Sequence, residues 1–384
     1  MNPRFTIDGS PALESHLAQT CDQVLAGVRQ LVPAAQLDGV LLGGGYGRGE
    51  GGVLKTPAGD QPYNDLEFYV FLRGNAILAE RKYRLPLHEL GESLSPAAGL
   101  EVEFKVLTLD KLRRSGPSMF YYDLVAGHRW QQGDDTLLAG CEQHHDAARI
   151  PLYEATRLLM NRCSGLLYSA ERLERPVFGP EEADFIGRNL AKAQLAFGDV
   201  LLTAHGQYHW SCQERHQRLA QWCAALAPEK NSFPAETALK ILAQHETGVD
   251  FKLHPRRSTE SRESLAARHQ ELSALGQTLW LWLETKRLGN AFASAREYAA
   301  TPLNLCPETS GLRNRLVNAR AFGVGALTDA RYPRERLFRA LALLLWEPAA
   351  LTGLRGLVQS ALRTTAGDRP GLTAAYAGLW GRFN

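Results

Sequence analysis

Two pairs of acidic residues stand two positions apart within apolar, strand-like segments. Asp65 and Glu67 belong to "NDLEFYV", and Glu101 and Glu103 belong to "LEVEFKV". Side chains alternate between the faces of a strand, so each pair is expected on one face, with its apolar neighbours in the core. Like charges side by side are unfavourable unless a cation lies between them. Carboxylate oxygens are the ligands that Mg²⁺ prefers, so the pattern predicts a magnesium site.

A glycine-rich turn precedes these carboxylates. The segment "LLGGGYGRGEGG", residues 41–52, holds seven glycines after a short apolar run. Backbone N–H groups in such a turn can approach phosphate oxygens with no side chain in the way. The GxxxxGK[ST] phosphate loop is excluded because no Lys-Ser or Lys-Thr follows, and the dinucleotide pattern GxGxxG matches only weakly. A phosphate-cradling turn beside carboxylates suits phosphoryl or nucleotidyl transfer by two metal ions.

The elements that position these residues change in character near residue 148. Before it we expect strands at 38–44, 65–72, 99–108 and 121–133, and helices at 11–31 and 76–94, the second interrupted by Pro86. After it, almost the whole sequence has helical periodicity. The predicted fold class is α+β: a short mixed β-sheet flanked by helices, followed by an all-α helical bundle. The predicted domains are residues 1–148 and 149–384.

Composition excludes several classes of function. The chain has 384 residues, 45% of them hydrophobic, and a formal net charge of +2, which predicts a soluble protein without an extended nucleic-acid track. The longest apolar stretch, 337–351, contains Arg339 and Glu347, which favours a buried helix and no membrane partner. The N-terminus lacks the pattern of an export signal, and the six cysteines form no CxxC, so a cytoplasmic location is expected.

The order of a glycine turn, an Asp-apolar-Glu pair and a later apolar-Glu-apolar strand resembles the nucleotidyltransferase superfamily, whose fold DNA polymerase beta shares. "GGYGRGE" (44–50) resembles the turn of the protein-PII uridylyltransferases, and "PYNDLEFYV" (62–70) resembles the metal-binding strand of kanamycin nucleotidyltransferase. "DLVAGHRWQQGDD" (123–135) is similar to the edge strand that closes the catalytic domain in many members. The resemblance covers residues 36–135. The extra segment 51–64 is expected to form a hairpin or flap beside the nucleotide.

The resemblance implies transfer of a nucleoside monophosphate from an NTP to an acceptor hydroxyl, with release of pyrophosphate and a requirement for two Mg²⁺ ions. Asp65 and Glu67 would bind both ions. Glu103, or Glu101 on the same face, would complete the ligands of the second ion and deprotonate or orient the acceptor hydroxyl.

Further residues are implied as ligands of the NTP phosphates. Gly44, Gly45 and Arg48 would hold the β- and γ-phosphates. Many members have Gly-Ser in this turn, whereas Gly44 and Gly45 offer only backbone groups. In the helical half, Lys192 and Asp199 lie about two helical turns apart and share a face. There, Lys192 would meet the triphosphate and Asp199 would serve as a second candidate base near the acceptor.

The acceptor is expected to be a small molecule, a sugar or an aminoglycoside-like compound. Alternatives within the enzyme class are nucleotidylation of a protein or RNA end and synthesis of a signalling nucleotide. The alternative from another class is an inactive nucleotide-binding or antitoxin-like module. Metal-dependent turnover of an NTP to pyrophosphate distinguishes that module from the enzymes.

Three other motifs carry weaker signals. Four residues have near-helical spacing that suits zinc, although Gly206 weakens the pattern: His205, His209, Cys212 and His216. The dipeptide His145-Asp146 matches the core of HD phosphohydrolases, but the remaining ligands have no convincing positions. Arg256 and Arg257 could clamp a phosphate or be solvated.

Overall fold

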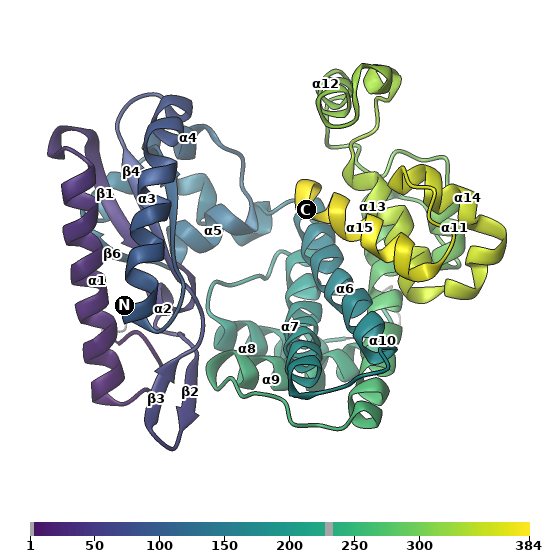
Figure 1. Cartoon of the computed structure of the whole chain (residues 1–384), viewed down its shortest axis with the longest axis horizontal. Coiled ribbons are helices and arrows are strands. Elements are labelled where there is room, and N and C mark those ends of the chain that lie inside the picture. The colour runs from purple at the N-terminus through teal and green to yellow at the C-terminus, as the bar shows by residue number, and fades with distance from the viewer. Residues whose placement is uncertain (1–3, 227–232) are drawn as a thin grey trace. The chain divides into compact units, whose positions relative to one another are not determined.

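Residues 4–226 and 233–384 are described by a computed structural model. They form an α+β structure with a small mixed four-stranded sheet near the N-terminus and a helical C-terminal region, so the predicted fold class is confirmed at that level (Figure 1). The chain divides into two units. Unit 1 comprises the chain up to Pro151 together with His205–Gln221 and Val249–Arg256, and unit 2 comprises the rest. The single predicted division at residue 148 did not anticipate the two later segments of unit 1.

The sheet of unit 1 has the strand order β5-β4-β1-β6. Its strands are β1 (Leu37–Leu42), β4 (Leu66–Leu72), β5 (Val102–Leu107) and β6 (Arg129–Gln132). β1 pairs antiparallel with β4 and β6, whereas β4 and β5 are parallel. Leu66 and Phe68 are fully buried, as the alternating pattern predicted. The strands predicted at 38–44, 65–72 and 99–108 are therefore present, with the last one shorter.

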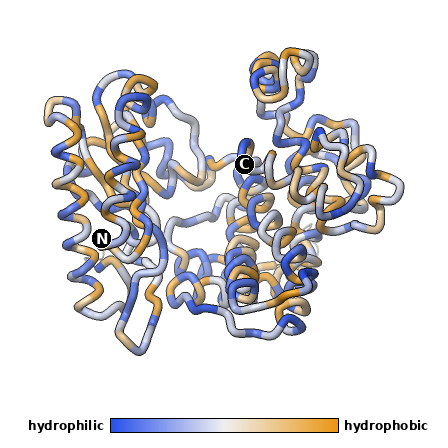
Figure 2. Tube along the Cα trace, viewed as in Figure 1, coloured by the Kyte–Doolittle hydropathy of each residue, from blue (hydrophilic) through white to orange (hydrophobic). Residues whose placement is uncertain are grey.

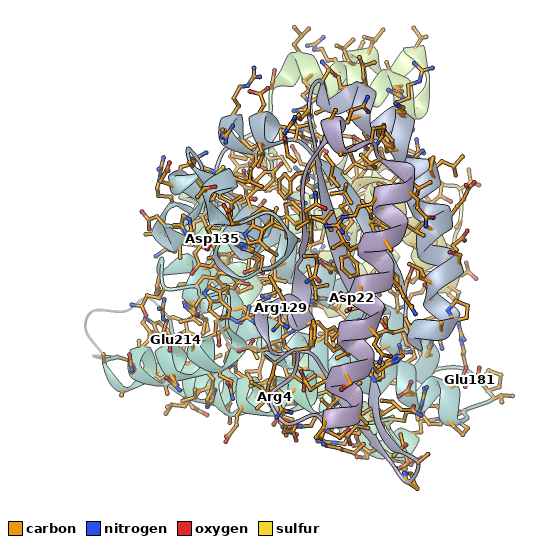
Figure 3. The ribbon with its side chains drawn as sticks, turned by 90° about the vertical axis from the view of Figure 1, so that its left-hand side faces the viewer. Arg4, Asp22, Arg129, Asp135, Glu181 and Glu214 are labelled. Atoms are coloured by element: carbon orange, nitrogen blue, oxygen red, sulfur yellow. The ribbon has the colours of Figure 1, made fainter. Side chains whose placement is uncertain are left out.

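Helices cover both faces of this sheet. They are α1 (Pro11–Leu31), α3 (Ala76–Ala98), α4 (Leu109–Arg114) and α5 (Met119–Ala126). Leu17 of α1 and Leu87 of α3 share a core cluster with Val40, whereas Leu124 of α5 belongs to a second cluster with Leu41. Because neighbouring residues of β1 point to opposite faces, α1 and α3 cover one face and α4 and α5 the other. Asp22 marks the solvent-facing side of α1 (Figure 3).

Two predicted elements were wrong in part. Helix α3 runs unbroken through Pro86 to Ala98, because Tyr83 and Leu87 are buried on either side of the proline and their packing outweighs its cost. The strand predicted at 121–133 exists only as β6. Residues 119–126 form helix α5 instead, whose first turn is capped by the Ser118 side chain accepting from the Tyr121 amide. β6 does lie at an edge of the sheet, as the similarity to the closing strand implied.

The extra segment after the glycine turn forms the predicted hairpin. Strand β2 (Val53–Thr56) pairs antiparallel with β3 (Gly59–Pro62) as a separate two-stranded sheet. The five-residue helix α2 (Gly44–Arg48) connects β1 to this region. The glycine turn therefore lies between the central strand of the sheet and the hairpin.

The rest of the chain is helical. Its helices are α6 (Leu152–Leu173), α7 (Pro180–Ala204), α8 (Cys212–Ala224), α9 (Ala235–Leu253), α10 (Arg262–Leu288), α11 (Ala295–Ala300), α12 (Gly311–Phe322), α13 (Arg334–Leu341), α14 (Leu351–Leu362) and α15 (Arg369–Phe383). The apolar stretch at 337–351 is buried through Leu345, as predicted. Across the described ranges no helix could cross a bilayer alone, and only the bent pair Arg334–Trp346 with Pro348–Leu362 has the necessary length and composition.

Candidate active site

The parallel pairing of β4 and β5 brings the predicted carboxylates together. Glu67 lies directly opposite Glu103 in the register, and Asp65 immediately precedes β4. Neighbouring strands are about 4.8 Å apart, so side chains at opposed positions on the same face are adjacent. Glu101 precedes β5, where its carbonyl accepts a 2.9 Å hydrogen bond from the Leu66 amide and its side chain is exposed. The register therefore places Glu103, rather than Glu101, beside Glu67.

The charges of these carboxylates act on one another. Burial, followed by the charge of Glu67, raises the pKa of Asp65. Burial, followed by the charge of Asp65, raises the pKa of Glu103. The Lys105 ammonium lowers both pKa values and lies 3.8 Å from Glu67 Oε2. Unit 1 therefore holds several interacting carboxylates with Lys105 beside them.

Glu67 is also anchored by a phenol. The Tyr69 hydroxyl donates a 2.7 Å hydrogen bond to Glu67 Oε2. Burial, and then the negative charge of Glu67, raise the pKa of Tyr69, so its hydroxyl stays protonated and remains a donor. This contact fixes one carboxylate oxygen of Glu67 at the surface of the cluster.

The donor set suits Mg²⁺ by the type of its ligand atoms. Asp65, Glu67 and Glu103 supply oxygen ligands from adjacent strands, and a divalent cation would relieve the repulsion that raises the pKa values of Asp65 and Glu103. Within residues 4–226 and 233–384, no three His, Cys, Asp or Glu side chains are already grouped around one metal position.

The glycine turn passes directly over Glu67. The Gly43 amide donates to the Glu67 carbonyl over 2.9 Å, and a Cβ on Gly44 would lie 3.5 Å from the carboxyl carbon of Glu67. Gly44 has a φ of 61°, a conformation that other residues rarely adopt. At Gly47 a Cβ would lie 2.2 Å from the Leu42 carbonyl oxygen, so only glycine lets α2 pack this closely on β1. The turn is thus a close backbone approach to the carboxylates.

Arg48 lies at the end of α2 with its donors turned inward. Its Nε donates to the Gly44 carbonyl over 2.9 Å, and its Nη1 donates to the Trp210 carbonyl over 2.8 Å. The same Nη1 lies 3.3 Å from Asp123 Oδ2. The guanidinium predicted to hold phosphates therefore also ties the glycine turn to α5 and to the segment 205–221.

Sequence reasoning missed a second charged residue of the same motif, Glu50. It is 4% exposed and accepts hydrogen bonds from Ser211 Oγ at 2.5 Å and from the Cys212 amide at 2.9 Å. Burial by itself raises the pKa of Glu50, but these hydrogen bonds and the charge of Lys252 outweigh it and lower the pKa. The sequence signal that could have indicated a role for Glu50 is its position, two residues after Arg48 and between glycines.

A second residue missed from the sequence is Lys252, near the end of α9 and within unit 1. A Cβ on Gly52 would lie 3.1 Å from the carbonyl oxygen of Lys252, so its backbone touches the end of the glycine segment. Burial and the positive charges of Arg48 and Arg215 lower the pKa of Lys252, although Cys212 and Glu50 act in the opposite direction. Its charge acts on Glu50, and among the described residues no hydrogen bond or ion pair of its ammonium is found. No local pattern around residue 252 could have indicated this placement.

Lys192 and Asp199 occupy different settings on helix α7 of unit 2. Asp199 is buried, with His245 Nε2 at 3.2 Å from its Oδ1, and its charge acts on Arg162. Lys192 is exposed. Their spacing does not give them the common environment that a shared face suggested, because the bundle buries most of this helix.

Several residues of the three weaker motifs are buried, cap a turn or form ion pairs. Burial raises the pKa of Cys212 to about 12, which disfavours the thiolate that zinc requires. Helix α7 ends at Ala204, so the histidines at 205 and 209 lie outside any helix. Asp146 accepts from the Ala148 amide over 2.9 Å and caps a short turn. Two aspartates pair with the arginines of the "HPRRS" loop: Asp250 with Arg256, and Asp184 with Arg257.

A hollow of about 650 Å³ lies between α3 and β5 and reaches Glu103. Its size is within the range of small-molecule sites. Its walls combine apolar and charged side chains: Arg84, Leu85, His88, Glu92, Ser95, Pro96, Glu101, Val102, Glu103 and Phe104. A small polar molecule in this hollow would meet one member of the carboxylate cluster.

Comparisons with known proteins identify no relative of this chain. No family model, no curated protein and no solved structure matches it. Its function is therefore inferred from the residues and their geometry.

Proposed function

We propose that this protein is a Mg²⁺-dependent nucleotidyltransferase of the DNA polymerase beta-like superfamily, which transfers a nucleoside monophosphate from an NTP to an acceptor hydroxyl. The observation that carries the proposal is the pairing of Glu67 with Glu103 on parallel strands, beside Asp65 and directly below the glycine turn. Carboxylates next to a backbone turn free of side chains are what nucleotidyl transfer requires.

Asp65, Glu67 and Glu103 would hold the two Mg²⁺ ions. When bound, these ions neutralise charge on the phosphates and make the acceptor oxygen a better nucleophile. The cluster contributes a negative surface that attracts divalent cations, and Tyr69 keeps one oxygen of Glu67 in place. Asp65 and Glu67 would bind both ions, and Glu103 would bind one of them.

Glu103 is the proposed general base. It lines the hollow between α3 and β5, where an acceptor hydroxyl could lie within reach of its carboxylate. It would take the proton of the acceptor hydroxyl as the acceptor oxygen forms a bond to the α-phosphorus. The bond from that phosphorus to the bridging oxygen breaks, and pyrophosphate leaves with the electron pair. Asp199, buried against His245, is left out of this step.

For the phosphates, we propose the N–H groups at the start of α2 and the ammonium of Lys252. The first N–H groups of a helix have no acceptor within it. Lys252 contacts the end of the glycine segment through its backbone and interacts with Glu50 only by charge, whereas the donors of Arg48 are engaged in hydrogen bonds. Lys192 is not among the phosphate ligands of the proposed site.

The acceptor best supported is a small molecule with both hydroxyl and amino groups. Three carboxylates and one arginine are among the residues that line the hollow: Glu92, Glu101 and Glu103, with Arg84. A protonated amine would complement this surface, which is consistent with an aminoglycoside-like compound.

The test is transfer of label from each of the four α-labelled NTPs, with Mg²⁺ and a small-molecule extract, followed by identification of the product and measurement of pyrophosphate. We expect the wild type to label one small molecule and Glu103→Gln to fail. Glu80→Gln is the control, because Glu80 is an exposed acidic residue of α3 that does not line the hollow. Binding of an NTP without pyrophosphate release in any extract would instead indicate an inactive nucleotide-binding module.

A further inference from the structure

The C-terminal part of unit 2 is strongly basic. Residues 311–384 contain eleven arginines, no lysine and four acidic residues, although the whole chain has a formal charge of only +2. Charge asymmetry of this kind indicates an anionic partner. Arginine binds phosphate through two parallel hydrogen bonds, which lysine cannot provide.

Helix α12 buries polar residues and exposes apolar ones, the reverse of an ordinary amphipathic helix. Its polar residues Asn314 and Asn318 face inward, where their side-chain amides donate to the carbonyls of Ala330, Asp329 and Arg331 over 2.8–3.0 Å. Its leucines face solvent: Leu312 is 73% exposed and Leu316 is 60% exposed. The helix projects from the rest of unit 2, and Figure 2 shows hydrophilic and hydrophobic residues together along it (Figure 1). The asparagine bonds therefore fix the leucines outward.

Arginines flank this apolar stripe on both sides. At 100° per residue, Leu312 and Leu316 form one stripe, with Arg313 and Arg320 on one flank and Arg315 on the other. All three arginines are exposed, and α12 contains no acidic residue. The following turn η5 (Val324–Thr328) adds Val324, which is 78% exposed, and Leu327. We call these residues of α12 and η5 the α12 surface.

We propose that the α12 surface docks on an anionic phospholipid bilayer. A helix that places leucines between flanking arginines lies in the interface, with the apolar side chains among the acyl chains and the cations at the headgroup phosphates. A nucleic acid would engage the arginines but leave the leucines and Val324 in water. Its cations flank the stripe on both sides, which suits a flat sheet of phosphates. This contact is peripheral and does not depend on nucleotidyl transfer.

The test uses the full chain and two kinds of vesicle: an equimolar mixture of phosphatidylglycerol and phosphatidylcholine, and phosphatidylcholine alone. We expect flotation with the anionic vesicles only. Replacing Arg313, Arg315 and Arg320 by Gln should weaken the binding about fivefold for each arginine removed. Leu312→Asp with Leu316→Asp should weaken it at least about tenfold, because both leucines leave the acyl region.

Matched controls separate docking from general charge attraction. Arg81, Arg149 and Arg296 are exposed arginines outside the α12 surface, and their replacement by Gln removes the same charge. Leu239→Asp on α9 is the control for the leucines, since Leu239 is 56% exposed. Neither control should lower binding by more than about twofold.

Insertion has its own readout. All six native cysteines are buried, so a polarity-sensitive dye can be placed on Val324→Cys. We expect a blue shift on the anionic vesicles, and none with the dye on Leu239→Cys. Equal binding to both vesicle types, wild-type binding by the leucine variant, or bound protein without the shift would overturn the proposal. So would binding to polyuridylate, lost in the arginine variant, with no binding to vesicles.

Discussion

Replacing Glu50 by Gln should destabilise unit 1 without touching the carboxylate cluster. The Glu50 carboxylate accepts from Ser211 Oγ and from the Cys212 amide, and it is 4% exposed. Hydrogen bonds to a charged group contribute about 1.5–3 kcal/mol each, and a glutamine keeps one acceptor oxygen but presents its NH₂ to the other donor. The loss of one charge-assisted bond, together with the unsatisfied buried donor, gives an expected destabilisation of about 2–4 kcal/mol.

This loss should depend on pH in a defined direction. The folded-state pKa of Glu50 is lowered, so its contribution is complete above the ordinary pKa of glutamate and disappears as the pH falls through the folded-state pKa. The difference in unfolding free energy between the wild type and Glu50→Gln should therefore be full at neutral pH and shrink in acid.

Urea unfolding measures the free energy, and hydrogen exchange of peptides covering 205–221 locates the effect. Exchange should become faster there, because the first turn of α8 loses its anchor on the glycine segment. Glu214→Gln is the control: Glu214 is on α8 but pairs with Arg218 at 39% side-chain exposure, and its loss should cost less than about 1 kcal/mol. A Glu50→Gln protein as stable as this control, with unchanged exchange at 205–221, would refute the anchoring role.

Three further predictions concern the proposed site. Asp65→Asn should abolish pyrophosphate release while leaving the melting temperature unchanged or higher, because it removes one charge from a repulsive cluster; activity within tenfold of wild type would contradict the metal assignment. Glu103→Gln should stabilise the fold at neutral pH, since a raised folded-state pKa disfavours the charged form, and the gain should vanish in acid, as thermal melts across pH would record. Mg²⁺ with an NTP should raise the melting temperature, and Lys252→Met should reduce that shift more than Lys192→Met does.

The strands and the carboxylate pair could be predicted because their signals are local. A period of two with branched and aromatic residues identifies β4, and the same alternation sends Asp65 and Glu67 to one face. The helix at 119–126 was missed for a physical reason: its run of aromatic and branched residues has high strand propensity, yet the Ser118 cap and burial of Leu124 select a helix. Pro86 predicted an interrupted helix where an unbroken one is present. Prolines usually break helices, but here the packing of neighbouring residues outweighs that tendency.

The rest of the candidate site could not be read from the sequence because it depends on contacts between distant segments. Nothing near Lys252 or Ser211 indicates that these residues lie beside the glycine segment. The spacing of Lys192 and Asp199 predicted a shared face correctly as helix geometry, but it carried no information on which parts of that helix the bundle buries. His245, which faces Asp199, comes from another helix altogether.

The glycine segment has two structural tasks, and its composition follows from having both. Its first glycines bring the backbone against Glu67 and β1, where a side chain on Gly44 or Gly47 would be strained or would clash. Its charged residues bind the segment 205–221: Arg48 donates to the Trp210 carbonyl, and Glu50 accepts from the Cys212 amide and from Ser211 Oγ. A loop that only cradled a phosphate would not need a buried glutamate. The motif therefore ties distant parts of the chain together in unit 1, and we expect substitutions at Arg48 to lower the stability of unit 1 as well as any activity of the proposed site.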